Sequence, residues 1–256
     1  MNFFEATIIS VVEGLTEFLP ISSTGHMILT SSLLKLHNDE FLKTFEIAIQ
    51  QGAISAIVFL YARKFLRNIT LYKKLLVAFI PAAVIGFVAY KTIKAYLFNP
   101  LVVSVALIVG GILLILLDKK IAHTAKKNTN LEDISYKNAF CIGLFQSIAV
   151  IPGVSRAAAS IIGGIFNGFD KKQATEFSFL LAIPTMFAAS GYDLLKTPVI
   201  VAQHEIMLLS FGSLIAFISA WIAVKLFLRL LENHGFAIFG YYRIILGFLF
   251  IKFCIY

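Results

Sequence analysis

The amino-acid sequence predicts an all-α polytopic membrane protein with six transmembrane helices and two re-entrant helical hairpins arranged as an inverted-topology repeat. Three observations lead to this fold class: an apolar composition, six apolar stretches of spanning length, and two shorter apolar regions interrupted by polar turns. Hydrophobic residues make up 59% of the 256 residues and charged residues 14%, whereas a soluble domain carries roughly 25% charge. Such a chain cannot cover a water-facing surface, and its length suits one membrane domain over residues 1–256.

Six stretches are candidate transmembrane helices, because each approaches the ~20 residues that a span requires. They are residues 44–61, 75–91, 101–117, 173–195, 206–224 and 236–256. The last is the weakest candidate, because Arg243 and Lys252 lie within it.

Two further apolar regions are each interrupted by a polar turn that contains proline. Residues 1–34 are broken at residues 20–25, and residues 138–168 are broken at residues 152–155. Each arm has about 15 residues, roughly 22 Å as a helix, which is too short for a ~30 Å hydrocarbon core. Both regions are therefore predicted to be re-entrant hairpins, whose broken backbone must be buried in protein or line a cavity.

The loop charges predict the orientation, because basic residues accumulate in cytoplasmic loops. Loops 62–74 and 118–137 each contain five Lys or Arg residues and should be cytoplasmic. Three loops have few or balanced charges and should lie outside: residues 35–43, 92–100 and 196–205. The sides alternate correctly if the first hairpin enters from outside and the second from the cytoplasm.

An inverted repeat follows from this alternation, since an odd number of spans follows each hairpin. The first repeat covers residues 1–117 and the second residues 138–256. Weak similarity supports the pairing: Gly-Leu-Thr-Glu at residues 14–17 precedes the first turn, and Gly-Leu-Phe-Gln at residues 143–146 precedes the second. In such folds, sites form near the bilayer midplane, where broken helices point their N-termini at anions.

Two glutamates before the first turn form a candidate metal site. Glu13 and Glu17 are four residues apart and share one helix face. Like charges there repel, and each is costly at membrane depth. The pair therefore needs a divalent cation such as Mg²⁺ or Ca²⁺, an arginine or a shared proton. The alternative is a solvent-facing pair near the membrane edge.

The first turn also supplies hydroxyls and a histidine. Ser22, Ser23 and Thr24 open the second arm, where a serine is commonly a helix N-cap. A helix N-terminus is also an anion site, so these hydroxyls would meet an incoming phosphate. His26 follows about one turn later and could exchange a proton with a hydroxyl, a water or a leaving oxygen. A packed polar histidine is the alternative.

The second turn contributes an arginine beside a helix start. Arg156 follows Gly153 and Ser155, and its planar guanidinium matches the geometry of phosphate oxygens. We expect all three residues to bind the substrate. The alternative for Arg156 is a structural ion pair with Glu13 or Glu17.

Together these residue types predict phosphoryl transfer. Carboxylates bind a hard divalent cation, and the cation and the arginine bind phosphate. The sequence contains neither a P-loop nor a G-x-S-x-G nucleophile elbow. The net charge of +8 does not indicate nucleic acid, because the basic residues lie in short loops between apolar runs.

The motifs resemble those of the undecaprenyl-diphosphate phosphatase family, also called bacitracin-resistance proteins. The resemblance rests on E-x-x-x-E and S-S-T-G-H within residues 13–26 and on P-G-x-S-R at residues 152–156, with further likeness at residues 43–46 and 176–181. It implies hydrolysis of a C55 polyprenyl diphosphate to the monophosphate and inorganic phosphate, which recycles the cell-wall lipid carrier. It also implies a divalent-ion requirement and a site that opens to the extracytoplasmic side.

Carried onto this chain, the resemblance assigns roles to the candidate residues. Glu13 and Glu17 would be the acidic pair, Ser23 the nucleophile candidate, His26 the acid or base, and Arg156 the phosphate clamp. The second motif departs after the arginine. The family usually shows Ser-Gly-x-Thr, where residues 157–160 read Ala-Ala-Ala-Ser, and Ser160 is the candidate replacement for the threonine.

Two other functional classes remain open on the residues alone. A transporter or flippase of a polyprenyl phosphate lipid would use the same architecture and bind the same headgroup without cleaving it. An intramembrane Ser/His protease would leave Arg156 and the paired glutamates unexplained. We expect a multi-pass protein of the bacterial inner (plasma) membrane, with membrane lipid and a second copy of the chain as partners.

Overall fold

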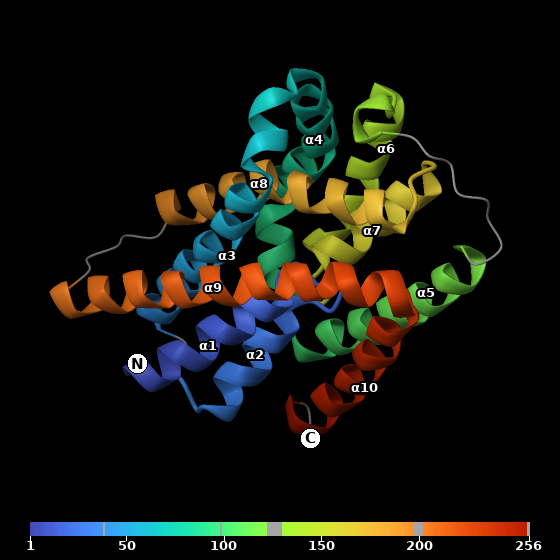
Figure 1. The fold of residues 1–256 in the computed structure, drawn as a ribbon. Helices are drawn as coiled ribbons and strands as arrows, with labels where there is room; N and C mark the ends of the chain where they lie inside the picture. The colour runs from blue at the N-terminus through green and yellow to red at the C-terminus, as the bar shows by residue number, and fades with distance from the viewer. Residues whose placement is uncertain (38, 98, 122–129, 197–201, 255–256) are drawn as a thin grey trace.

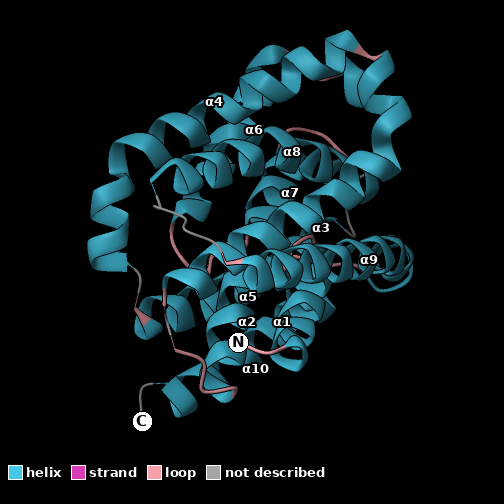
Figure 2. Ribbon diagram, turned by 90° about the vertical axis from the view of Figure 1, so that its left-hand side faces the viewer, coloured by secondary structure: helices cyan, strands magenta, loops and turns pink. Residues whose placement is uncertain are grey.

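The computed structural model describes residues 1–37, 39–97, 99–121, 130–196 and 202–254, and every regular element in these ranges is helical (Figures 1 and 2). Three short 3₁₀ or π segments, at Ile93–Leu97, Leu131–Asp133 and Ile148–Val150, accompany the α-helices. The α-helices of the described residues are α1 (Phe3–Thr16), α2 (Ser23–Leu33), α3 (Glu40–Arg67), α4 (Ile69–Thr92), α5 (Pro100–Ile121), α6 (Tyr136–Ser147), α7 (Arg156–Phe166), α8 (Lys171–Lys196), α9 (Gln203–His234) and α10 (Ala237–Cys254).

Four of these helices contain segments that are long and apolar enough to cross a membrane. The segments are Glu40–Lys64, Ile69–Thr92, Pro100–Lys119 and Gln203–Glu232, in α3, α4, α5 and α9. Large apolar side chains are exposed on α4, α5, α9 and α10, among them Val88, Leu116 and Ile245. Because a soluble protein rarely exposes so much contiguous apolar surface, the chain is a multi-pass membrane protein.

Four of the six expected spans, residues 44–61, 75–91, 101–117 and 206–224, lie within these segments. Helices α8 and α10 cover the expected spans 173–195 and 236–254, but neither is among the four segments that meet the criteria of length and low charge. Polar residues explain the difference for α8, which begins with Lys171 and Lys172 and contains Glu176. The expected span 236–256 also ends with two residues outside the described ranges.

The expected loop 62–74 is mostly helical. Helix α3 continues to Arg67 and α4 begins at Ile69, so Asn68 alone separates them. The Asn68 side chain accepts a hydrogen bond from Leu71 N at 3.0 Å, which is an N-cap for α4. The turn lies at the far end of the molecule from both termini in Figure 1.

Packing pairs helices that are distant in the sequence. Helix α1 packs along α9, α6 packs along α4, and α5 packs along α10. Figure 1 shows α9 crossing in front of α1, with α5 beside α10. Helices α3 and α8 also pack together, and α7 packs along α8.

An aromatic cluster joins the first break to the interior. Phe18 packs edge-on against Phe179, with ring centroids 5.8 Å apart. Phe179 contacts Phe227 in the same way, and Phe227 contacts Phe239. Phe18, Phe179 and Phe227 are completely buried. Because buried aromatic rings contribute both area and preferred edge-to-face geometry, this cluster fixes the segment that follows Glu17.

Each break contains one residue with positive φ before a serine-capped helix. Ser22 has φ 71° and its side chain caps α2, whereas Gly153 has φ 90° and Ser155 caps α7. A glycine adopts such a conformation freely. At Ser22 it stores about 1–3 kcal/mol of strain, which the surrounding packing must hold in place.

Candidate active site

The two breaks meet in the interior, although they are far apart in the sequence. Arg156 Nη2, at the start of α7, lies 3.1 Å from Glu17 Oε1, just after α1. Ser155 Oγ donates a second, longer hydrogen bond of 3.4 Å to the carbonyl oxygen of Leu19. One residue pair thus joins the acidic motif of the first half to the basic motif of the second.

Glu17 is the central residue of this site, because each of its carboxylate oxygens has a different partner. Oε1 accepts from Arg156, and Oε2 accepts from Ser23 Oγ at 2.6 Å. The side chains of Glu17 and Arg156 are only 6% and 13% exposed. Arginine, carboxylate and hydroxyl therefore form a continuous chain in an environment where charge interactions are stronger than in water.

Arg156 has further partners and one hydrogen-bond donor without a partner among the described residues. Nη1 donates to the carbonyl oxygen of Ser178 at 3.0 Å, and the guanidinium lies over the Phe18 ring, 5.6 Å from its centroid. Nε is buried and has no hydrogen-bond partner among the described residues. Buried donors are nearly always paired, so an unpaired one at this position favours an anionic ligand that supplies the acceptor.

Glu13 lies on the same side of α1 as Glu17 and is buried. Glu17, Glu46 and Arg156 all act on it electrostatically. Two carboxylates and one arginine therefore share this interior region, and Glu46 brings a third acid. Two other polar residues of the span regions have structural partners: Gln50 accepts from Ser190 Oγ, and Glu176 pairs with Lys64.

The acidic pair fits a divalent cation only if other ligands complete the site. Among the described residues, no group of three or more His, Cys, Asp or Glu side chains is placed to hold a metal ion. Mg²⁺, however, is commonly bound by one or two carboxylates together with water and substrate phosphate. Glu13 and Glu17 are two carboxylates of this kind, and the metal site stays a prediction.

His26 lies in the first turn of α2, buried, with both ring nitrogens engaged. Nδ1 lies 2.8 Å from the carbonyl oxygen of Ser22, and Nε2 lies 2.7 Å from the hydroxyl of Tyr242 on α10. A carbonyl only accepts, so Nδ1 donates; in the neutral imidazole Nε2 then accepts from Tyr242. The hydroxyl of Ser23 is directed to Glu17, so His26 and Ser23 have separate partners.

The other expected substrate ligands lie around the two helix starts. Ser22 and Ser155 are buried caps, which accept from Gly25 N and Ala158 N respectively. Thr24 is exposed, and its proposed contact with the substrate stays a prediction. Ser160 is completely buried, and its hydroxyl donates to Ser178 at 2.7 Å, so it joins α7 to α8.

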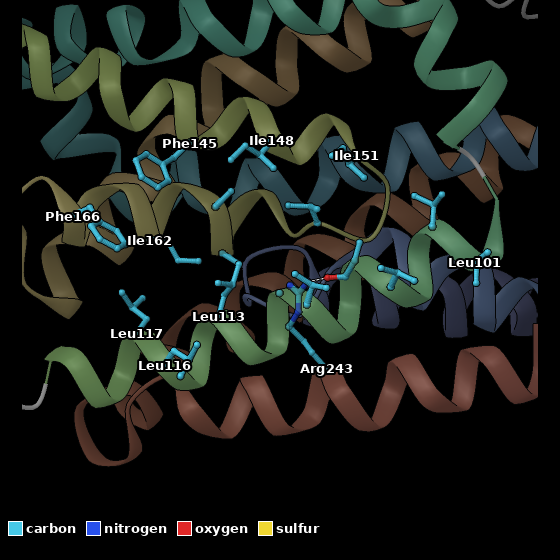
Figure 3. A pocket seen from close by; sticks show the side chains of 18 residues that line it. Leu101, Leu113, Leu116, Leu117, Phe145, Ile148, Ile151, Ile162, Phe166 and Arg243 are labelled. Carbon is cyan, nitrogen blue, oxygen red and sulfur yellow. Dashed lines mark hydrogen bonds between the residues drawn. The ribbon is translucent and has the colours of Figure 1, made fainter.

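An apolar pocket of about 730 Å³ lies beside the second break, between α5 and α7 (Figure 3). Its lining includes Val109, Leu113, Ala158 and Ile162, and Arg243 is the only charged residue among those that line it. Residues 158 and 162 lie on the face of α7 opposite Arg156, since successive residues turn by about 100° along a helix. The pocket therefore suits a hydrocarbon ligand, next to a polar site on the other side of α7.

Two contributors to this region were not identified from the sequence. Arg243 was treated as a charge that weakens the sixth span, yet it is completely buried and bonded to the backbone of both breaks. An isolated arginine in an apolar run was the available signal, because such residues usually face the protein interior. Tyr242 had no comparable signal, because it is an uncharged residue in an apolar run and is still 45% exposed.

The fold and the site define a class: a multi-pass helical membrane protein with a buried carboxylate–arginine–hydroxyl site beside an apolar pocket. The family described as bacitracin resistance protein BacA matches residues 6–249. The chain therefore belongs to this family.

Curated relatives are similar along nearly the whole chain. The chain is 49% identical to an undecaprenyl-diphosphatase of Persephonella marina over 253 residues, covering 99% of both chains. It is 48% identical to that of Aquifex aeolicus, again over 99% of both chains. It is 47% identical to that of Bdellovibrio bacteriovorus over 96% of this chain and 94% of the relative.

Proposed function

We propose that the protein is a membrane phosphatase that hydrolyses undecaprenyl diphosphate to the monophosphate and inorganic phosphate. This reaction recycles the cell-wall lipid carrier and confers resistance to bacitracin. The relatives named undecaprenyl-diphosphatase support the substrate and the reaction. The observation that carries the site assignment is the buried chain from Arg156 through Glu17 to Ser23, with Arg156 Nε left without a partner.

In this proposal Arg156 holds the diphosphate. Its guanidinium cannot act as an acid or base, but it pairs with phosphate oxygens and offsets charge that develops in the transition state. An entering phosphate oxygen would satisfy Nε and compete with Glu17 for Nη2. Glu17 is thereby released from its ion pair while substrate is bound.

Ser23 is the proposed nucleophile, with Glu17 as its base. Glu17 Oε2 lies 2.6 Å from Ser23 Oγ, within the reach that proton transfer requires. Ser23 Oγ would attack the terminal phosphorus, the bond to the bridging oxygen would break, and Glu17 would take the hydroxyl proton. Undecaprenyl monophosphate leaves, and water then releases inorganic phosphate from the serine. The competing route is direct attack by water, with Ser23 only orienting the phosphate.

His26 remains the proposed acid or base, and only its protonated form would give a proton to the leaving oxygen. Its contacts with Ser22 and Tyr242 hold the ring in one orientation. Glu13 and Glu17 would hold a Mg²⁺ or Ca²⁺ ion, which supplies charge neutralisation at the phosphate oxygens when bound. We expect excess chelator to abolish activity of the wild type. Full activity in excess chelator would remove the metal from the mechanism.

The apolar pocket is the proposed site for part of the polyprenyl chain. Its lining is hydrocarbon, and it adjoins the second break, where the phosphate clamp begins α7. A diphosphate held at Arg156 would place the lipid tail around the start of this helix. The tail would then lie against α5 and the far face of α7.

We also propose the inverted repeat of residues 1–117 and 138–256, with six spans and two re-entrant hairpins. The packing supports it: α1 packs on α9, and its proposed counterpart α6 packs on α4. The two matching glycines support it as well. A Cβ at Gly14 would collide with the backbone of Ala216 in α9, and one at Gly143 with that of Ala78 in α4.

Orientation and assembly complete the proposal. The site would open to the extracytoplasmic side of the bacterial inner membrane, both termini would lie outside, and the chain would form a homodimer. A cysteine at position 68, in a variant lacking Cys141 and Cys254, tests the orientation. A membrane-impermeant reagent should not label it in intact cells but should do so after permeabilisation. Labelling in intact cells would contradict the proposed topology.

The deciding experiment is phosphate release by the purified protein. Undecaprenyl diphosphate in detergent should yield inorganic phosphate and the monophosphate in equal amounts. The runner-up, a flippase of polyprenyl phosphate, would bind the lipid and release no phosphate. Its only support is architectural, whereas the names of the relatives favour hydrolysis.

A further inference from the structure

Helix α10 brings two adjacent side chains to the two breaks. Arg243 is the largest of the completely buried side chains, and Tyr242 contacts His26. Figure 3 shows Arg243 extending from α10 to the backbone of α5. Neither side chain is assigned a contact with the substrate in the reaction proposed above.

Arg243 bonds only to backbone carbonyls among its hydrogen-bond partners in the described part of the chain. Nη1 donates to Pro20 O at 3.1 Å and Nη2 to Gly153 O at 3.0 Å, so one guanidinium joins both breaks. Nη2 and Nε donate to Ala106 and Leu107 of α5, at 3.0 and 3.3 Å. A buried cation is expensive unless its donors are paired, so these contacts are a built feature.

The sequence of α5 leaves room for this guanidinium. A Cβ at Gly110 would lie 2.8 Å from Arg243 Cζ. Any side chain at position 110 would therefore displace the guanidinium from carbonyls on three segments. The close approach of the Arg243 guanidinium to α5 requires a glycine at position 110.

Tyr242 holds the His26 ring from the side opposite Ser22. Its hydroxyl lies 2.7 Å from Nε2, and the two rings are stacked with centroids 5.6 Å apart and planes at 4°. Ser22 O fixes Nδ1 at 2.8 Å. With both nitrogens engaged, the imidazole has a single orientation relative to the start of α2.

We propose that Tyr242 and Arg243 are positioning residues for the phosphatase reaction, an inference that rests on the proposed function. Arg243 sets the distance between the two breaks, and hence the position of Arg156 relative to Glu17 and Ser23. Tyr242 sets the orientation of His26. Neither side chain needs to touch the reacting phosphate.

The first test compares two neighbouring tyrosines. Tyr242→Phe keeps the stacked ring and removes the hydroxyl, so kcat should fall about tenfold while KM stays within about twofold. Tyr241, on the same helix, is 58% exposed, so Tyr241→Phe should match the wild type. A rise in KM with unchanged kcat would contradict positioning, because it would indicate direct binding of substrate.

The second test changes the arginine in two ways. Arg243→Lys keeps the charge but replaces a planar fork with one ammonium, which cannot bond to three segments. A shift of about 1 Å between catalytic groups can cost about 10²-fold in rate, so kcat should fall by up to that factor. Gly110→Ala displaces the same guanidinium without removing it. This variant tests the positioning role if Arg243→Lys does not fold.

The outcomes separate this inference from the proposed function. An inactive wild type would refute the phosphatase proposal itself. An active wild type, with Tyr242→Phe and Gly110→Ala both retaining its kcat, would refute the positioning role. A selective loss of kcat in both variants, at an unchanged melting temperature for Tyr242→Phe, would establish it.

Discussion

The two breaks share a backbone plan but differ in chemistry. Each has a proline, a residue with positive φ and a serine N-cap before a short helix. The first break supplies Glu17, Ser23 and His26, which can exchange protons, whereas the second supplies Arg156, which cannot. The comparison supports the proposed division of roles, with bond breaking at the first break and anion binding at the second.

The position that precedes each break shows the same division. Glu17 has its counterpart in Gln146, a buried neutral residue whose amide donates to Thr185 at 3.0 Å. A carboxylate at position 146 would have added a second negative charge without a second arginine to balance it. The neutral residue lets the second half contribute a net positive charge, and this balances Glu17 across the interface between the halves.

Ser23→Ala should have the largest effect if the first break carries the nucleophile. Loss of a covalent nucleophile with an adjacent base costs on the order of 10⁴-fold or more in kcat. A loss of only about tenfold would instead support direct attack by water. Phosphate release in one lipid–detergent mixture measures the effect. Ser32→Ala, an exposed serine on the same helix, is the control and should leave the rate unchanged.

Glu17→Gln should have the second-largest effect, a loss of about 10³-fold in kcat. The amide can accept a hydrogen bond from Ser23 but cannot take its proton. The matched control is Gln146→Leu at the corresponding position of the second half. It removes an amide oxygen that is buried without a partner, so activity should be largely retained. Equal losses of kcat in the two variants would contradict the proposal that the first half alone carries the proton transfer.

Arg156→Lys tests the second break with the charge retained. Lysine has no planar fork, so it loses the bidentate contact with phosphate and should lower kcat/KM about 10²-fold. Arg63→Lys, on the surface, is the control. If Arg156→Ala bound and hydrolysed the lipid normally, the second break would be only a structural feature of the fold.

Much of the fold was predictable because apolar length and turn chemistry are local properties. The two breaks, their short arms and the capping serines follow from proline, glycine and serine at fixed positions. Four of the six expected spans coincide with the apolar segments found in the described residues, and the polar start of α8 lowers the hydropathy of that helix. Hydropathy cannot tell a charge facing lipid from one facing carbonyls.

The site was predictable in its residue types but not in its pairings. A carboxylate, a hydroxyl and an arginine beside broken helices indicated phosphate chemistry. The pairing of Arg156 with Glu17 spans 139 residues, and that of His26 with Tyr242 of α10 spans 216. Such contacts are set by tertiary packing, for which the sequence has no periodic signal.

The smallest expected effect concerns the apolar pocket beside the second break, which is the proposed site of the lipid tail. Val109 lines the pocket beside the second break and is 49% exposed. Val109→Trp should fill part of the pocket and raise KM for undecaprenyl diphosphate about three- to tenfold, on the scale of a few buried methylenes, with kcat nearly unchanged. A short-chain polyprenyl diphosphate, which does not extend into the pocket, should show no rise. Ile112→Trp places the same ring at an exposed position of α5 outside the pocket lining and is the control. An equal rise for both substrates would mean that the pocket does not hold the tail, and the second break would then contribute only the phosphate clamp.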